Sequence, residues 1–163
     1  MNLTFILFIV LNFASNVLCA DAKQSYQILL EEEFNPAVNE VIIQGIQKYN
    51  LPFFKQSDLQ FFVVYARNEQ SEVIGGLCGD ILGTCACVDY MWVDEKHRGQ
   101  GIGSKLFAKL ENFAKSKKCT SIQLFTYDFQ AEKFYKKQGF QSIGIVPKWI
   151  EDHDTIFLRK MLK

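Results

Sequence analysis

Two spacings of apolar residues alternate along the first half of the chain and predict where helices and strands lie. Asn35 is a suitable N-cap, and Pro36 is a suitable first helical residue. Apolar side chains then recur three, four and seven residues apart, which predicts an amphipathic helix that ends at residues 50–52. Continuous apolar runs predict strands at residues 26–30, 61–66, 73–82 and 85–93. Because short polar turns join the last three, we expect them to form an antiparallel meander.

The second half of the chain changes to alternating helices and strands. A helix is expected from Gly101, with lysines on the face opposite its apolar residues. A strand at residues 122–127 is followed by a short helix, for which Gly139 is a suitable C′ residue. Strands at residues 140–146 and 155–161 complete the order β-α-β-β-β-α-β-α-β-β. This order predicts an α/β fold built on a mixed sheet.

The first twenty residues form a separate segment without any charged side chain. Residues 5–11 are an unbroken apolar run, and this run is too short for a membrane span, which needs about 20 apolar residues. Residues 20–22 read Ala-Asp-Ala, an A-x-A pattern typical of a cleavage site. We therefore expect residues 1–22 to be a signal peptide or an N-terminal anchor and residues 23–163 to form one domain. The alternatives are a mis-set start codon and an extra apolar helix.

Composition and charge limit the class of function. Hydrophobic residues make up 48% and charged residues 22% of the chain, which is typical of a folded domain. The net charge of zero argues against a dedicated nucleic-acid binder, whose surface would be basic. Residues 21–92 carry 10 acidic and 4 basic side chains, whereas residues 93–143 carry 5 acidic and 10 basic ones. The basic part is therefore expected to bind a compact anion.

The cysteines and histidines do not indicate a metal site. The chain has five cysteines and two histidines, and no two cysteines form C-x-x-C. Cys78, Cys85 and Cys87 fall in apolar runs, so we expect them to be small core residues. A disulfide is the alternative if the protein is exported. Residues 152–154 read Asp-His-Asp and are expected to form a surface turn rather than a metal site.

A glycine-rich turn at residues 98–104 carries the strongest chemical signal. Glycines follow the end of an expected strand and lead directly into the expected helix. The backbone N–H groups at a helix N-terminus lack partners, and the helix dipole adds partial positive charge there. Because glycine lets the backbone approach closely, the turn is suited to a phosphate. It is neither a Walker loop nor the dinucleotide fingerprint, because Ser104 stands where the last glycine of the latter would be.

Two segments together resemble a known family. Arg98–Gly103 resembles the acetyl-CoA motif of the GNAT superfamily of N-acetyltransferases, Arg/Gln-x-x-Gly-x-Gly/Ala. Ala131–Phe140 looks like the family's A-x-x-F-Y-x-x-x-G-F signature. The order of the expected elements between Tyr26 and Leu162 is also that of the GNAT fold. The resemblance implies an α+β mixed sheet of the GNAT-like acyl-CoA N-acyltransferase type, with acetyl-CoA as co-substrate and no metal.

The resemblance also implies where acetyl-CoA binds. In the family, the pantetheine arm lies between the fourth and fifth strands and pairs with strand backbone. The matching positions here are Met91, Trp92 and Val93. The pyrophosphate is expected to bind the backbone N–H groups of Arg98, Gly99, Gln100, Gly101, Ile102, Gly103 and Ser104. The lysines of the following helix are expected to be solvated, with a contact to the 3′-phosphate as the alternative for one or two of them.

The catalytic residues follow from the same resemblance. A family tyrosine that protonates the departing sulfur corresponds to Tyr135. Family members that bind cationic amines often carry an acid at the position of Asp89, which is therefore a candidate base or amine anchor. A structural hydrogen bond is the alternative for Asp89. Asp128 is a further candidate near the coenzyme, and Trp92 and Trp149 are candidates to line the acceptor pocket.

The function implied is direct transfer of an acetyl group to a primary amine in a ternary complex. A small-molecule amine is expected as acceptor, and the acidic part of the chain would attract a cationic one. The alternatives are a protein amine and a non-catalytic acyl-CoA-binding module. No nucleic-acid partner is expected, and membrane contact is expected only through residues 1–22. A leader indicates export or a membrane, whereas acetyl-CoA use indicates access to the cytosol. The oligomeric state stays open, with a dimer as one alternative.

Overall fold

A computed structural model describes residues 26–53 and 59–163 of the chain. The expected leader at residues 1–22 lies outside the described residues. The chain divides into two units, Met1–Ile42 and Ile43–Lys163, and each is described by itself. No helix among the described residues is long and apolar enough to cross a membrane.

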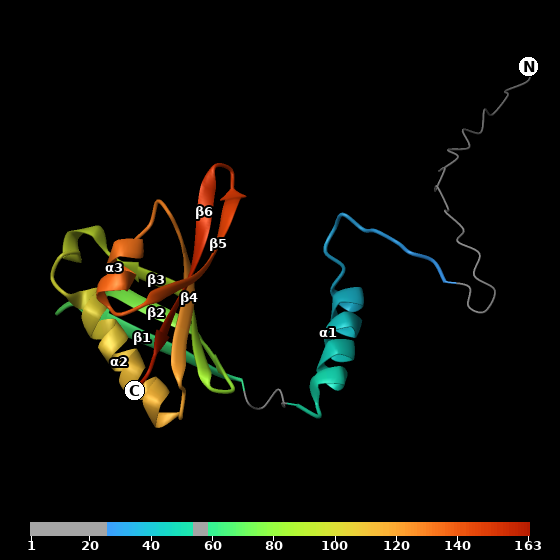
Figure 1. The fold of residues 1–163 in the computed structure, drawn as a ribbon, viewed down its shortest axis with the longest axis horizontal. Coiled ribbons are helices and arrows are strands. Elements are labelled where there is room, and N and C mark those ends of the chain that lie inside the picture. Colours follow the sequence, from blue (N-terminus) through green and yellow to red (C-terminus); the bar gives the residue numbers. More distant parts are fainter. Residues whose placement is uncertain (1–25, 54–58) are drawn as a thin grey trace, which may run out of the picture. The chain divides into compact units, whose positions relative to one another are not determined.

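The described residues form helices and strands close to the expected positions. Asn35 caps the first helix, because its side-chain Oδ1 accepts a hydrogen bond from the backbone N–H of Val38 at 3.2 Å. The elements, labelled in Figure 1, are α1 (Pro36–Asn50), β1 (Gln60–Arg67), β2 (Val73–Leu82), β3 (Cys85–Val93), the 3-10 helix η2 (Glu95–His97), α2 (Ile102–Ser116), β4 (Ser121–Tyr127), α3 (Glu132–Lys137), β5 (Gln141–Ile150) and β6 (His153–Met161).

The strands form one mixed sheet, as expected. Their order across the sheet is β1-β2-β3-β4-β6-β5. Strands β1, β2 and β3 are antiparallel neighbours, which confirms the predicted meander. Strand β3 runs parallel to β4, with helix α2 as the crossover between them, and β4 and β5 both pair antiparallel with β6.

One predicted strand is not formed. Residues 26–30 are not part of any strand, so the sheet has six strands among the described residues rather than the seven expected. The apolar side chains of this segment are exposed, at 86% for both Ile28 and Leu30. An apolar run forms a strand only when a neighbouring strand supplies hydrogen-bond partners for its backbone. The sequence of the run carries no information about that partner.

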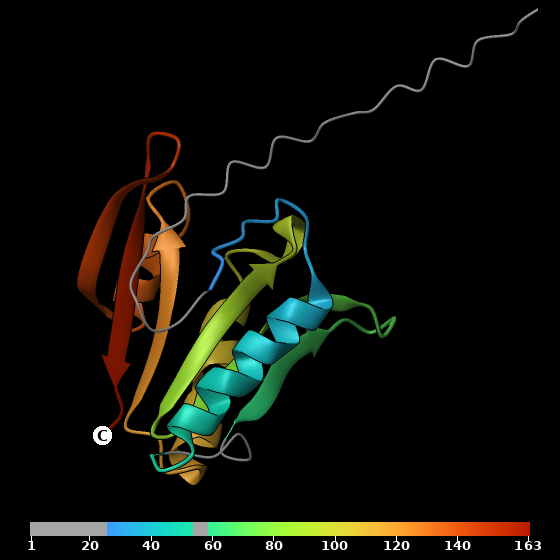
Figure 2. The ribbon, with the colours of Figure 1, turned by 90° about the vertical axis from the view of Figure 1, so that its right-hand side faces the viewer.

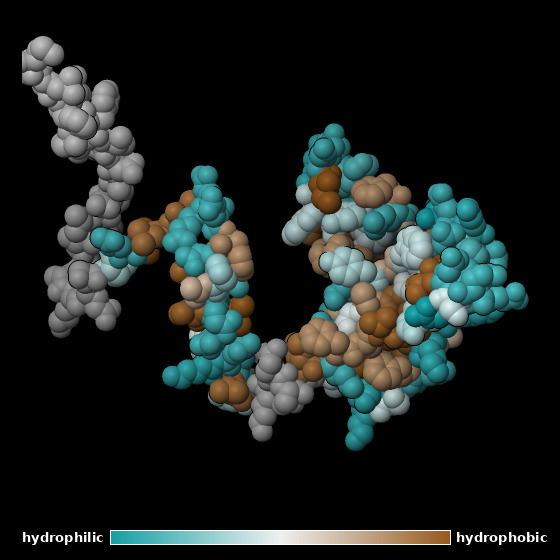
Figure 3. Space-filling view, turned by 180° about the vertical axis from the view of Figure 1, so that it is seen from behind, coloured by the Kyte–Doolittle hydropathy of each residue, from teal (hydrophilic) through white to brown (hydrophobic). Residues whose placement is uncertain are grey.

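The core of the second unit lies between the sheet and α2. Leu106, Phe107 and Leu110 on the apolar face of α2 are almost completely buried, and so is Ile122 on β4. Helix α3 joins the same core through Tyr135. This packing fixes the N-terminus of α2 and the side chains of α3 relative to the ends of β3 and β4. The space-filling view shows that apolar side chains also reach the surface, on α1 and between hydrophilic side chains of the second unit (Figure 3).

Candidate functional site

Strands β3 and β4 separate halfway along their length. They pair only from Cys85 with Ser121 to Val88 with Leu124, and their carboxyl ends diverge beyond that point (Figure 2). A β-bulge marks the same place on the other side of β3. Cys78 of β2 pairs with Tyr90 and Gly79 with Val88, which leaves Asp89 as the extra residue. A bulge bends its strand and increases the local twist, so it accounts for the separation.

Gly79 makes this bulge possible. A Cβ atom at Gly79 would lie only 1.9 Å from the backbone oxygen of Cys87 and 3.1 Å from the Cα of Val88. The bulged backbone of β3 therefore occupies the space that any other residue would need for its side chain. The bulge therefore requires both Gly79 on β2 and the extra residue Asp89 on β3.

The separation leaves backbone groups of β3 without a strand partner. The backbone N–H of Asp94 donates to the carbonyl of Ile74, so the backbone groups of Asp94 face β2. Successive residues of a strand direct their backbone groups to opposite sides. Met91 and Val93 therefore direct theirs into the gap, where the carbonyl of Val93 accepts a hydrogen bond from the Arg98 side chain at 3.0 Å. An extended ligand in the gap can pair with these groups as a strand would.

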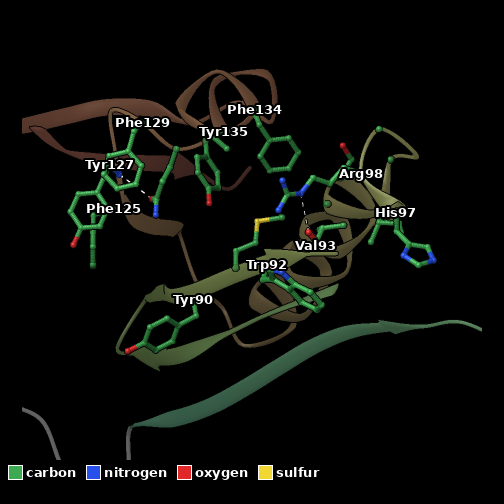
Figure 4. Close-up of a pocket in the computed structure, with 18 of the residues that line it drawn as sticks. Tyr90, Trp92, Val93, His97, Arg98, Phe125, Tyr127, Phe129, Phe134 and Tyr135 are labelled. Carbon is green, nitrogen blue, oxygen red and sulfur yellow. Dashed lines mark hydrogen bonds between the residues drawn. The ribbon is translucent and has the colours of Figure 1, made fainter. Parts of the chain in front are cut away.

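A pocket of about 1010 Å³ occupies the gap. Its volume is at the upper end of the range for small-molecule sites. Figure 4 shows Tyr135 between two groups of side chains, with Phe125, Tyr127 and Phe129 on one side and Arg98 and His97 on the other. The residues that line it come from β3, the turn that follows, α2, β4 and α3: Asp89–Val93, His97–Gly99, Gly101–Ser104, Phe125, Tyr127, Phe129–Ala131, Phe134 and Tyr135.

One end of the pocket is the N-terminus of α2. The first helical hydrogen bond runs from the N–H of Lys105 to the carbonyl of Gly101, so the N–H groups of Gly101 to Ser104 have no partner within the helix. No side chain caps this terminus, and no acidic residue lies in its first turn. A capping side chain or an acid usually stabilises a helix N-terminus, and this terminus has neither. The terminus is therefore suited to a phosphate group.

The three glycines of the turn have two different roles. Gly99 and Gly101 have φ angles of +77° and +78°, which favour glycine, and a Cβ atom on either would meet nothing within 4 Å. Gly103 is required for packing, since its Cβ would lie 2.9 Å from the Phe134 ring and 3.0 Å from the Met91 Cε. The first two glycines shape an open cradle, and the third brings α2 close to α3 and β3.

The polar side chains of the turn mainly stabilise it. The Arg98 side chain donates a hydrogen bond to the carbonyl of Val93, and its guanidinium lies 3.4 Å from the Glu95 carboxylate. The Gln100 side chain donates to the carbonyl of Lys96 and is the one predicted coenzyme-binding residue outside the pocket lining. The hydroxyl of Ser104 accepts a hydrogen bond from Gln138 at 3.0 Å, which connects α2 to the end of α3. These side chains are therefore engaged within the protein, and the phosphate contacts of the backbone N–H groups stay a prediction.

Tyr135, the predicted proton donor, is a buried phenol of the pocket. Its ring packs edge-on against Phe107 at 6.0 Å and Phe140 at 6.1 Å, and only 9% of the residue is exposed. Its hydroxyl lies in the pocket and makes no hydrogen bond to any described residue. Burial raises the pKa of the phenol above its ordinary value, so Tyr135 carries its proton at neutral pH.

Asp89 lies in the pocket lining as the bulged residue of β3. The bulge shifts the alternation of the strand, so that Met91 and Val93 join Ala86 and Val88 on the core side. Asp80 on β2 has a raised pKa. The larger cause is its partial burial, and the smaller cause is electrostatic repulsion from Asp89. Asp89 therefore places a carboxylate in the pocket lining, and Asp80 is a second acid close to it on β2, outside the lining.

Other candidates from the sequence lie elsewhere. Asp128 does not line the pocket. Its carboxylate accepts a hydrogen bond from the backbone N–H of Asp154 and forms another with the ring Nδ1 of His153 at 2.8 Å, and these hydrogen bonds lower the pKa of Asp128. Trp92 lines the pocket, whereas Trp149 is on β5 outside the lining. The helix lysines lie outside the lining as well. The four cysteines among the described residues are free, and no cluster there could hold a metal.

The sequence reasoning missed the aromatic side of the pocket. Phe125, Tyr127 and Phe129 occupy every second position, so one face of the chain is aromatic where β4 ends. This alternation could have been read from the sequence. It was hidden because Phe125 and Tyr127 belong to an apolar run that predicts a buried strand, and nothing in the run indicates which face the core covers.

The arrangement fits an acyl-CoA thioester. Its diphosphate would lie at the N-terminus of α2, and its extended arm would pair with Met91 and Val93 in the gap. The thioester would then reach Tyr135. The donors present, unpaired backbone N–H groups of a turn and of a strand, are those that such a molecule requires.

Comparisons with known proteins agree with this geometry. Residues 22–140 match the model of the acetyltransferase (GNAT) family. The chain is 35% identical to a blasticidin-S acetyltransferase of Streptomyces morookaense over 60% of this chain and 73% of the relative. It is 31% identical to an acetyltransferase of Agrobacterium fabrum over 71% and 85% of the two chains. The crystal structure of an acetyltransferase from Bacillus cereus superposes with a TM-score of 0.74 at 30% identity, over 82% of this chain and 98% of that one.

The expected resemblance and fold class are thereby confirmed, and so is the expectation of an acetyl-transferring enzyme. The family model covers both predicted motifs, and the solved relative shares the fold over 82% of this chain. The chain belongs to the acetyltransferase (GNAT) family.

Proposed function

We propose that this enzyme transfers the acetyl group of acetyl-CoA to the primary amine of a small molecule, in a complex that holds both substrates at once. One observation carries the proposal. The gap between β3 and β4 leads continuously from the uncapped N-terminus of α2 to the buried phenol of Tyr135. A phosphate site, a strand-like channel and a proton donor thus follow one another along a single pocket.

The residues of the pocket hold and orient the donor. When bound, acetyl-CoA supplies the acetyl group as a thioester. The turn from Arg98 to Ser104 binds its phosphates through backbone N–H groups, and the basic side chains around the turn add long-range attraction. Met91 and Val93 fix the arm through backbone hydrogen bonds. An N–H group on this part of β3 polarises the carbonyl that the amine attacks.

Proton transfers accompany the reaction. The attacking nitrogen must be neutral, so Asp89, which lines the pocket, first accepts one proton from the ammonium group, directly or through water, and releases it to solvent. As the C–S bond breaks, the sulfur receives a proton from the hydroxyl of Tyr135. The nitrogen loses a second proton as the C–N bond forms, and this proton returns through water to the phenolate of Tyr135. No covalent enzyme intermediate is part of the proposal, because none of the described cysteines lines the pocket.

Two findings support a small-molecule acceptor. The relative with 35% identity is named for acetylation of blasticidin S, which is a small molecule. In this chain, Asp89 places negative charge in the pocket lining, and an amine arrives as a cation at neutral pH.

An acceptor screen tests the proposal. The full chain is incubated with acetyl-CoA and a panel of small primary amines, peptides and intact proteins, and release of free thiol is measured with a colorimetric reagent. We expect acetylation of small amines, with products identified by mass spectrometry. Acetylation of peptides or proteins alone would contradict the proposal.

A further inference from the structure

Three aromatic side chains of the pocket form a surface that the proposed acetyl-CoA site does not use. Phe125, Tyr127 and Phe129 project from one face of β4 and of the turn after it, and all three line the pocket. The rings of Tyr127 and Phe129 are stacked, with centroids 5.4 Å apart and planes 9° apart. Phe125 meets Tyr127 edge-on at 5.9 Å. We refer to these three residues as the aromatic shelf.

Contacts with neighbouring side chains hold the aromatic shelf in place. The Phe129 ring packs edge-on against His153 at 4.7 Å, and His153 is in turn held by Asp128 at 2.8 Å. The side-chain oxygen of Gln130 accepts hydrogen bonds from the Thr126 hydroxyl and from the N–H of Tyr127. The turn that presents the shelf is therefore fixed before any ligand binds.

Core packing does not account for the aromatic shelf. None of its residues belongs to the buried core or to the side chains packed against it. Phe125 is 48% and Phe129 58% exposed. Two large rings stacked in parallel present a flat apolar surface, and the hydrophobic effect favours any ligand that covers it. A ligand with a planar ring would extend the stack.

The same pocket also attracts a cation. Asp89 lines it from β3, and Asp80 lies nearby on β2. Neither acid forms an ion pair with any residue in the part of the chain that the structure describes. An ammonium group between the aromatic shelf and Asp89 would gain from the carboxylate and from the faces of the rings.

We propose that the acceptor is a primary amine attached to a planar aromatic or heteroaromatic ring, which stacks on the aromatic shelf while its amino group lies near Asp89. The inference rests on the proposed function and specifies its acceptor. Figure 4 shows that the shelf and Arg98 lie on opposite sides of Tyr135, so the ring and the phosphates of acetyl-CoA occupy different ends of the pocket.

A matched pair of amines tests the role of the ring. Benzylamine and cyclohexylmethylamine have the same carbon skeleton and the same amino group, and only the first has a planar π system. We expect kcat/KM for acetylation of benzylamine to be about 3- to 10-fold higher, which corresponds to the usual strength of an aromatic pair. Equal values for the two amines would overturn the proposal.

Variants of the aromatic shelf locate the effect. Phe129→Leu and Tyr127→Leu should each abolish the preference for benzylamine, mainly through KM for the amine, and leave KM for acetyl-CoA unchanged. Phe157→Leu is the matched control, because Phe157 packs against Phe125 at 6.1 Å but does not line the pocket. Thermal melting checks that all three variants fold. A preference retained in both shelf variants would also overturn the proposal.

Calorimetry separates this inference from the proposed function. The two amines are titrated into the CoA-saturated enzyme, where no acetyl transfer occurs. Tighter binding of benzylamine, lost in Phe129→Leu, would support the aromatic shelf even if the screen shows no acetylation of small amines. Acetylation of small amines without any ring preference in binding or rate would reject the shelf and leave the proposed function intact.

Discussion

Replacing Tyr135 with phenylalanine tests the chemistry of the site most directly. The change removes one hydroxyl and keeps the ring that packs between Phe107 and Phe140. The hydroxyl makes no hydrogen bond to any described residue, so its loss leaves no polar group unpaired. We therefore expect the variant to fold and melt like the original protein below pH 10.

The expected loss of rate follows from the role of the phenol. General acid catalysis contributes roughly 10²–10⁴-fold. A thiolate is a fair leaving group, and burial raises the pKa of Tyr135 and so makes it a weaker acid. The loss should therefore be about 10²-fold in kcat, or about 2.7 kcal/mol of transition-state stabilisation. KM for acetyl-CoA should barely change, because the hydroxyl acts mainly in the transition state.

Steady-state kinetics with a confirmed acceptor measures both constants. Tyr65→Phe is the matched control, because Tyr65 lies on β1 outside the pocket lining. An unchanged kcat in Tyr135→Phe would refute the assignment of the proton donor. A raised KM with the same kcat would show that the hydroxyl binds substrate rather than donating a proton.

The raised pKa of Tyr135 adds a second readout. Burial favours the neutral phenol, so the pKa of Tyr135 in the folded state lies above its ordinary value of 10.0. Its contribution to stability is therefore complete below pH 10.0 and is lost as the pH rises through the folded-state pKa. Denaturant unfolding at several alkaline pH values should show a smaller loss of unfolding free energy in Tyr135→Phe than in the original protein.

Three further substitutions test the rest of the site. Gly101→Asp should reduce affinity for CoA in calorimetry by at least about tenfold, because it places a carboxylate in the phosphate cradle. Gly83→Asp is the matched control, because Gly83 lies at a turn with a similar positive φ and equally open surroundings, and it should leave CoA affinity unchanged. Gly79→Ala should lower both the melting temperature and acetyl-CoA affinity, because its Cβ would collide with the Cys87 carbonyl, and Gly144→Ala on β5, where a Cβ meets nothing, should do neither. Asp89→Asn should depress kcat/KM most at lower pH, where the acceptor amine is protonated and needs a base, and a pH–rate profile parallel to that of the original protein would contradict this role.

The sequence predicted the local elements well, because each depended on a local signal. The helices at Pro36 and Ile102 and the strands at Val73 and Cys85 begin where caps, glycines and apolar periodicity place them. Residues 26–30 show the limit of such signals, since a strand also requires a partner that the run does not specify.

The site was predictable only in part, for a related reason. The glycine turn and Tyr135 belong to contiguous motifs, and the structure brings both to one pocket. The bulge depends on Gly79 and Asp89, which lie on different strands and meet only through register. The aromatic shelf depends on which face of β4 the core covers. Neither the register of the bulge nor the covered face of β4 can be predicted from one segment of the sequence.

The register around Asp89 has a consequence for how such a site can arise. If Asp89 is left out of the count, the remaining residues of β3 alternate without interruption, with Ala86, Val88, Met91 and Val93 all toward the core. A chain one residue shorter at this position would thus have an ordinary strand, able to pair with β4 along its whole length. The open channel depends on a single extra residue opposite a glycine, so deletion of Asp89 is expected to close the gap, whereas a substitution at Asp89 leaves the residue count of the strand unchanged.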